Sequence, residues 1–117
     1  MDLHCDGHPI HPPAWVEVKN VTLVENGVAL FPDAVSERGR KHLDLLARRV
    51  RAGERGAMIY VLQRADGRVI RPADAIDPDY GKALRRAAKA GVELHGLRVA
   101  GSADGLRVTG TVPVEVR

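Results

Sequence analysis

The sequence predicts a mixed α/β fold, in which a mixed β-sheet is flanked by helices. The chain has 117 residues, a length at which a single domain is the default. Segments with strand-like alternation and many β-branched residues are interspersed with two segments that have the 3.6-residue apolar period of helices. Because helices lie between strands along the chain, at least one crossover connection is required, and parallel strands are expected beside antiparallel ones.

The first confident strand and its return are expected near the start of the chain. Residues 14–23 are rich in β-branched and aromatic side chains, with polar positions at Glu17 and Lys19. The pair Asn26-Gly27 tolerates the positive φ angles of a tight turn. We therefore expect a β-hairpin that returns along residues 28–31.

An amphipathic helix and a buried strand are expected next. Apolar residues recur with the spacing of one helix face at Leu43, Leu46, Ala47 and Val50. The helix is expected to begin near Val35 and to end at Gly53 and Gly56. Residues 57–62 are almost all apolar, which is typical of a central strand that is covered on both faces.

The last third of the chain predicts a second helix and a second hairpin. Asp77 is a favourable N-cap and Pro78 suits the first helical position, so a helix is expected over residues 78–90. Gly91 can adopt the left-handed conformation that ends a helix. The other expected segments are a loop at residues 72–76 and strands at residues 92–99 and 106–112.

Composition excludes several classes of protein. Cys5 is the single cysteine, so an internal disulfide is excluded, and no apolar signal-peptide region is recognisable at the start, which favours a cytoplasmic protein. The apolar run at residues 57–62 is far shorter than the roughly 18 residues that span a membrane. Four aromatic residues are too few for the stacking platforms of single-strand nucleic-acid binders.

The positive charge is concentrated in one segment. The formal net charge is +3, and residues 37–55 carry seven basic side chains against three acidic ones. Such a cluster can face the phosphates of a nucleic acid duplex. A solvated helix face explains the same charges.

Glu17 and Lys19 are the first residues with recognisable catalytic chemistry. Alternation places both on one face of their strand and sends Val18 to the core. With a second carboxylate, the pair could hold Mg²⁺ while the lysine stabilises a hydroxide. Asp2 is the candidate, because a hairpin-like return would bring residues 1–4 beside this strand. An exposed ion pair between Glu17 and Lys19 is the simpler alternative.

A zinc site is a second alternative near the N-terminus. His4, Cys5, His8 and His11 provide four nitrogen or sulfur donors within eight residues, and zinc accepts such ligands. Their spacing matches no common zinc finger, however, because neighbouring residues on a strand face opposite ways.

Several motifs resemble the sugar fermentation stimulation protein A family. The most specific is Phe31-Pro32-Asp33-Ala34-Val35-Ser36-Glu37-Arg38-Gly39, which lies between Glu17-Val18-Lys19 and Lys41-His42-Leu43. The resemblance covers residues 2–99 without a large gap. Further matching motifs are Gln63-Arg64, Pro72-Ala73-Asp74, Ile76-Asp77-Pro78 and Gly91-Val92.

The resemblance implies a PD-(D/E)xK nuclease-like domain with a restriction-endonuclease-like core. In that fold Asp2 and Glu17 would bind a divalent metal, Mg²⁺ or Mn²⁺, and Lys19 would complete the catalytic set. Usual family members carry an OB-like domain ahead of the nuclease-like one. We expect residues 1–117 to form one nuclease-like domain that is truncated at its N-terminus and lacks the OB-like domain. A homodimer is expected to cover the sheet edge or apolar face that this would expose.

The family also implies DNA binding and regulation of sugar utilisation. The predicted function is binding of duplex DNA through phosphates, with little sequence preference, and Mg²⁺-dependent cleavage is the enzymatic hypothesis. The alternative is a catalytically inactive regulator or interaction module. His95 is expected to be structural. The candidate phosphate-binding residues lie in or near the helix that begins close to Val35 and at the end of the central strand: Ser36, Glu37, Arg38, Lys41, His42 and Gln63.

Overall fold

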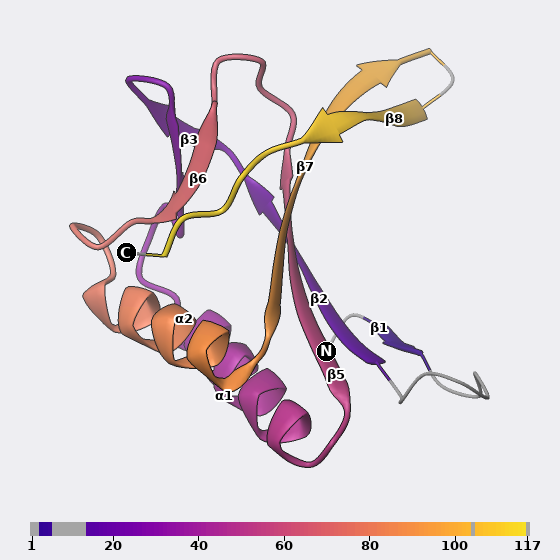
Figure 1. Cartoon of the computed structure of the whole chain (residues 1–117). Helices are drawn as coiled ribbons and strands as arrows, with labels where there is room; N and C mark the ends of the chain where they lie inside the picture. Colours follow the sequence, from indigo (N-terminus) through magenta and orange to yellow (C-terminus); the bar gives the residue numbers. More distant parts are fainter. Residues whose placement is uncertain (1–2, 6–13, 104, 117) are drawn as a thin grey trace.

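The computed structural model describes residues 3–5, 14–103 and 105–116 and confirms the mixed α/β class. Figure 1 shows the course of the chain. Its elements are β1 (Leu3–Cys5), β2 (Ala14–Val21), β3 (Leu23–Glu25), β4 (Val28–Phe31), α1 (Glu37–Arg51), β5 (Arg55–Leu62), β6 (Val69–Pro72), α2 (Pro78–Ala90), β7 (Glu93–Ser102) and β8 (Gly105–Thr111).

The strands form two sheets beside one helical layer. The larger sheet has the order β1-β2-β5-β7-β8, in which β5 lies between two parallel neighbours and both outer pairs are antiparallel. The smaller sheet has the order β3-β4-β6. Helices α1 and α2 pack side by side on the same side of the larger sheet (Figure 1). Among the described residues, no helix is long and apolar enough to cross a membrane.

The predicted strand at residues 14–23 is divided between the two sheets. β2 ends at Val21, which is buried, and β3 begins at Leu23 after the exposed Thr22. The hairpin at Asn26-Gly27 is confirmed, but it joins β3 to β4 and leaves β2 in the other sheet. Alternation gives no sign of this change, because the strand-like composition continues across Thr22.

The strand β6 was not expected from the sequence. It pairs in parallel with β4, so that Ala29 lies opposite Ile70 and Phe31 opposite Pro72. Ile70 is almost completely buried. The predicted loop therefore starts after Pro72 rather than at it, because a long-range partner strand stabilises four residues that carry little local signal.

Both helices begin within two residues of where the sequence predicts them. The Ser36 hydroxyl accepts a hydrogen bond from the Gly39 amide at 3.0 Å, so α1 starts two residues after Val35. Asp77 and the left-handed Gly91 begin and end α2 as predicted.

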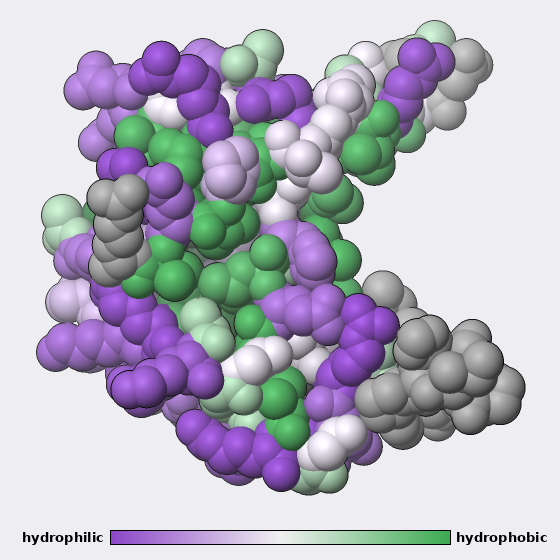
Figure 2. All heavy atoms as spheres, in the orientation of Figure 1, coloured by the Kyte–Doolittle hydropathy of each residue, from purple (hydrophilic) through white to green (hydrophobic). Residues whose placement is uncertain are grey.

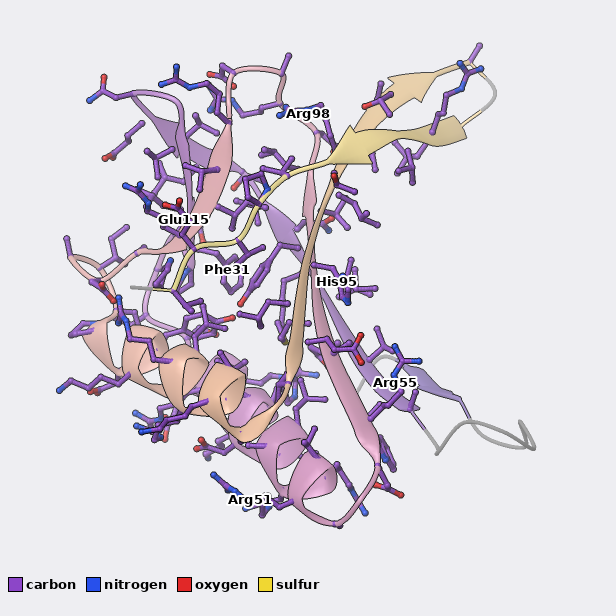
Figure 3. All side chains as sticks on the ribbon, in the orientation of Figure 1. Phe31, Arg51, Arg55, His95, Arg98 and Glu115 are labelled. Carbon is purple, nitrogen blue, oxygen red and sulfur yellow. The ribbon has the colours of Figure 1, made fainter. Side chains whose placement is uncertain are left out.

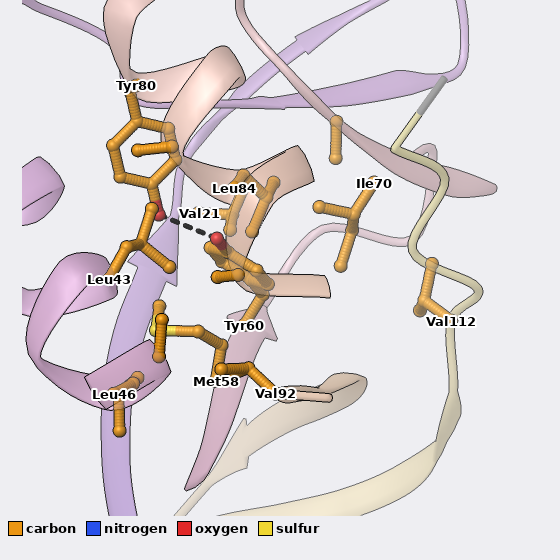
Figure 4. Close-up of a cluster of buried hydrophobic side chains, with 14 of the residues drawn as sticks. Val21, Leu43, Leu46, Met58, Tyr60, Ile70, Tyr80, Leu84, Val92 and Val112 are labelled. Carbon is orange, nitrogen blue, oxygen red and sulfur yellow. Dashed lines mark hydrogen bonds between the residues drawn. The ribbon is translucent and has the colours of Figure 1, made fainter. Parts of the chain in front are cut away.

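The core lies between the helices and the two sheets (Figure 4). At its centre the hydroxyls of Tyr60 and Tyr80 are 2.6 Å apart, and the Phe31 ring packs against both tyrosines. Leu43 and Leu46 bring α1 onto this cluster, and both are fully buried.

The C-terminal segment after β8 crosses β7 and reaches the smaller sheet. The Val112 amide donates to the Gly96 carbonyl at 2.9 Å, and Ile70 exchanges backbone hydrogen bonds with residues 113 and 115. A Cβ atom on Gly96 would lie 2.3 Å from the Val112 carbonyl oxygen. The segment therefore ties the two sheets together, and a glycine makes its close approach possible.

The face of the larger sheet away from the helices has no described element packed over it. It carries the half-buried apolar side chains Val16, Val18, Ile59, Val61 and Leu97. Leu106 and Val108 on the hairpin β7–β8 are exposed by 67% and 58%. In Figure 2, hydrophobic side chains line the recess below this hairpin. The central strand β5 is therefore fully buried on one face only, which corrects the expectation of two covered faces.

Candidate functional site

The candidate site is centred on Glu17, whose side chain points from β2 toward α1. Its Oε1 atom lies 2.9 Å from Lys19 Nζ and 2.9 Å from His42 Nδ1. Glu17 is 1% exposed, while the side chains of Lys19 and His42 are 22% and 15% exposed. One carboxylate oxygen therefore has a basic side chain on two sides, one from its own strand and one from the helix.

The prediction about the faces of β2 is wrong in one respect. Glu17 and Lys19 do share a face, but this is the face that packs against the helices, and Val18 is half-buried on the opposite one. The simpler alternative of an exposed ion pair is also wrong, because Glu17 is buried. A buried carboxylate is costly without partners, and Lys19 and His42 supply them.

His42 has a place that the sequence did not predict. It was expected to face a phosphate, yet its ring lies against the Glu17 carboxylate. The geometry is that of an ion pair without an aligned hydrogen bond, so the contact is attractive when the imidazole is protonated. A weak signal existed, because His42 lies three residues after Gly39 and four before Leu46, both of which are buried.

A surface hollow of about 660 Å³ adjoins His42 along α1. Four of the six predicted phosphate-binding residues line it, and two neighbours that were not predicted complete the set. Its described lining residues are Glu37, Arg38, Lys41, His42, Leu45 and Arg48. Glu37 lies 3.8 Å from Lys41, so the hollow includes one acidic side chain among its basic ones.

The other two predicted phosphate-binding residues are placed differently. Ser36 caps α1 with its hydroxyl, and its backbone amide donates to Asp77 Oδ2 at 2.8 Å. Gln63 follows the end of β5, is exposed and is not among the residues that line the hollow. The sequence predicted the helix correctly. It did not predict that Ser36 caps this helix with its hydroxyl and donates its amide to Asp77.

The candidate second carboxylate, Asp2, lies outside the described residues. The expected hairpin-like return is confirmed by the described backbone, because β1 pairs antiparallel with β2 and Leu3 lies opposite Val16. His8 and His11 of the alternative zinc site also lie outside the described residues.

The described donors fit a hard divalent cation in part. The carboxylate of Glu17 is an oxygen ligand of the kind that Mg²⁺ prefers, and Mg²⁺ commonly takes only one or two protein carboxylates beside water and phosphate. Within the described part of the chain, no group of three His, Cys, Asp or Glu side chains is gathered for a metal. Asp2 would therefore have to supply the second carboxylate.

His95 belongs to a separate ion-pair network on the far face of the sheet (Figure 3). Its Nε2 atom lies 3.2 Å from Glu93 Oε1, and Arg55 donates two hydrogen bonds to the same carboxylate. The hydrogen bonds from Arg55 lower the pKa of Glu93 to about 2, and His95 adds to the effect. This network is remote from Glu17, whose side chain faces the helices.

Comparison with known proteins gives one consistent family. Residues 1–105 match the family described as "Sugar fermentation stimulation protein RE domain". The sugar fermentation stimulation protein homolog of Geobacter sulfurreducens is 57% identical over 100 residues, which are 86% of this chain and 43% of that protein. The homolog of Halorhodospira halophila is 54% identical over 111 residues, which are 93% of this chain and 46% of that protein.

A solved structure has the same fold. The structure of SfsA from Pyrococcus furiosus in complex with Ca²⁺ superposes with a TM-score of 0.81 at 29% sequence identity. The match covers 88% of this chain and 45% of that one. The chain thus spans slightly less than half the length of the relatives that it matches.

Proposed function

Since this chain belongs to the sugar fermentation stimulation protein family, we propose that it binds duplex DNA through phosphates with little sequence preference. The observation that carries the proposal is the hollow on α1. It gathers Arg38, Lys41 and Arg48 directly beside the Glu17 site. Basic side chains around a shallow surface suit a polyanion, and phosphate contacts alone carry no base preference.

The phosphate contacts are assigned to side chains rather than to the start of α1. The Gly39 amide is already bonded to the Ser36 hydroxyl, and the Ser36 amide to Asp77. Arg38 is exposed and can offer a bidentate contact to a phosphate. Lys41 is exposed beside it and acts as a point charge.

We further propose that the site cleaves DNA with Mg²⁺ or Mn²⁺. Glu17 and Asp2 would hold the metal, which would supply a hydroxide and polarise the phosphate. Lys19 would stabilise that hydroxide. Attack of the hydroxide on phosphorus would break the bond to the leaving oxygen, which would keep the bonding electrons and take a proton from solvent. The buried pairing of Glu17 with Lys19 supports this assignment, as does the presence of Ca²⁺ in the structure of the Pyrococcus furiosus relative.

Binding is tested with a fluorescently labelled duplex of random sequence. Titrations are made at rising salt concentration, and affinity is expected to fall steeply, because each neutralised phosphate releases counterions. Two duplexes of unrelated sequence should bind about equally. Affinity that does not respond to salt, or no binding at all, would contradict the proposal.

Cleavage is tested by nicking of supercoiled plasmid in Mg²⁺ or Mn²⁺. Glu17→Gln and Lys19→Ala should each abolish nicking, while Lys89→Ala, on the exposed side of α2, should leave it unchanged. Nicking that survives both site substitutions would exclude the proposed site. DNA binding without any nicking would favour the alternative, which is a catalytically inactive regulator of sugar utilisation or an interaction module. For either function, we propose the cytoplasm as the location of the protein.

We also propose that two copies of the chain form a homodimer through the uncovered face of the larger sheet. That face carries five half-buried apolar side chains beside the Arg55–Glu93–His95 network, and the hairpin β7–β8 adds Leu106 and Val108. Helix α1 with its basic side chains lies on the other side of the sheet. Two copies would therefore bury apolar surface without bringing their basic faces together. Sedimentation equilibrium should give twice 12.7 kDa, and Val108→Lys should weaken the association. A 12.7 kDa species at every concentration would contradict the homodimer.

A further inference from the structure

Two contacts define how α1 runs along β2. His42 lies against Glu17, and the guanidinium of Arg49 lies 4.6 Å from the centre of the Trp15 ring. The later helix residue therefore meets the earlier strand residue. Helix α1 runs antiparallel to β2, and the Glu17 site lies at the second turn of the helix, at the sixth of its 15 residues.

The basic residues of the hollow consequently lie on both sides of that site. Arg38 precedes His42 by four residues and Arg48 follows it by six, and both line the same hollow. At 1.5 Å per residue, they are about 6 Å and about 9 Å away from His42 along the helix axis. Leu45, which lies between His42 and Arg48 along the helix, adds an apolar side chain to the lining.

The spacing can be compared with that of DNA phosphates. The ten residues from Arg38 to Arg48 correspond to about 15 Å of helix, and one DNA strand carries a phosphate about every 3.4 Å along its axis. A strand of about five nucleotides spans the axial distance between the two arginines. A single phosphate or a dinucleotide is much shorter than that distance.

We infer that the site takes a continuous strand laid along α1, with Arg48 contacting a phosphate on the opposite side of Glu17 from Arg38. This inference rests on the proposed DNA binding and adds its length, direction and one further binding residue. The strand crosses the Glu17 site at its middle, so phosphates on both sides of the central one are held. Leu45 offers a sugar an apolar contact between the charged positions.

Arg48 has a matched control on the same helix. Arg48 and Arg51 are both exposed, both lie in the last turn of α1, and neither forms an ion pair with another described residue. Arg48 lines the hollow and Arg51 does not. Figure 3 shows Arg51 at the far end of α1. Replacing each by glutamine removes the same charge, so nonspecific electrostatic effects cancel in the comparison.

The test measures the affinity of hairpin DNA with stems of three and eight base pairs, each closed by an uncharged linker. For the long stem, Arg48→Gln should weaken binding about fivefold and lower the slope of log affinity against log salt by about one. Arg51→Gln should change neither value. For the short stem, Arg48→Gln and the unsubstituted chain should have the same affinity, because a short strand held at the Arg38 end does not reach residue 48.

The outcomes separate the inference from the proposal on which it rests. If Arg48→Gln and Arg51→Gln have the same effect on the long stem while the unsubstituted chain binds both stems, the inference is wrong and DNA binding stands. If the unsubstituted chain binds neither stem, DNA binding itself is wrong. Far-ultraviolet circular dichroism of both variants checks that each is folded, and urea unfolding checks that their stabilities match.

Discussion

Glu17 is the residue on which the site depends, because its carboxylate is buried and Lys19 and His42 both meet its Oε1 atom. The sequence could predict the neighbourhood of Glu17 and Lys19, since they are two residues apart on one strand. It could not predict the contact with His42, which comes from packing α1 onto β2 across 25 positions of sequence. Nor could alternation tell which face of β2 is the buried one, because a buried Glu17 is unusual.

The pairing of Glu17 with Lys19 leads to a prediction about stability. Lys19→Met should lower the free energy of unfolding by about 2 kcal/mol, because it leaves the buried carboxylate with one partner fewer. Adding Glu17→Gln should recover part of this loss, since the charge that needed the partner is then gone. Urea unfolding of the two single variants and the double variant measures the coupling. Strictly additive effects would show that the two side chains do not interact.

The tyrosine pair of the core predicts a loss of stability at high pH. Burial raises the pKa of Tyr60 well above its usual value of 10.0, and the neighbouring Tyr80 adds to the effect. The folded chain therefore keeps a proton that the unfolded chain releases, so stability is full below pH 10 and falls as pH rises above it. Urea unfolding at pH 8 and pH 11 should show a smaller alkaline loss for Tyr60→Phe. An equal loss in both proteins would contradict the assignment.

At the scale of elements, the helix ends are where sequence and structure agree best. Asp77, Pro78 and Gly91 act locally, so their residue types alone predict where α2 starts and stops. The division of β2 from β3 and the strand β6 escaped prediction because they depend on pairing with distant strands. The second role of Asp77 was also hidden, since its Oδ2 atom accepts from the Ser36 amide that precedes the other helix.

This double role of Asp77 predicts an unequal effect of removing the two caps. Asp77→Ala should cost about 2 kcal/mol, because the carboxylate holds the Tyr80 amide of α2 as well as the Ser36 amide. Ser36→Ala should cost about 1 kcal/mol, because it loses only the bond to Gly39. Thermal and urea unfolding compare the two variants. Equal costs would show that the link between the helix starts contributes nothing.

At the scale of the whole molecule, the segment after β8 holds the two sheets together over Gly96. The sequence predicted the strands on either side of this crossing but not the crossing, because a glycine inside a strand pattern has several explanations. The basic face of α1 is likewise a property of the whole fold. The sequence predicted its charge, and only the packing of α1 along β2 brings that charge beside Glu17.

The crossing predicts that Gly96→Ala destabilises the molecule out of proportion to its size. The added Cβ would lie 2.3 Å from the Val112 carbonyl oxygen, so the C-terminal segment must move. We expect a loss of about 2–3 kcal/mol and faster hydrogen exchange at the amides of Ile70 and Val112. Gly110→Ala is the control, since a Cβ there meets nothing within 4 Å. Unchanged exchange at both amides in Gly96→Ala would contradict this account of the crossing.

The proposal that the basic face of α1 beside Glu17 binds DNA phosphates is tested by the salt dependence of duplex affinity. The measurement compares the unsubstituted chain with the double variant Arg38→Gln/Lys41→Gln. If both side chains neutralise a phosphate, the slope of log affinity against log salt should fall by about 1.8, at about 0.9 per lost contact. A slope that stays the same in the double variant would show that DNA, if bound, lies elsewhere on the molecule.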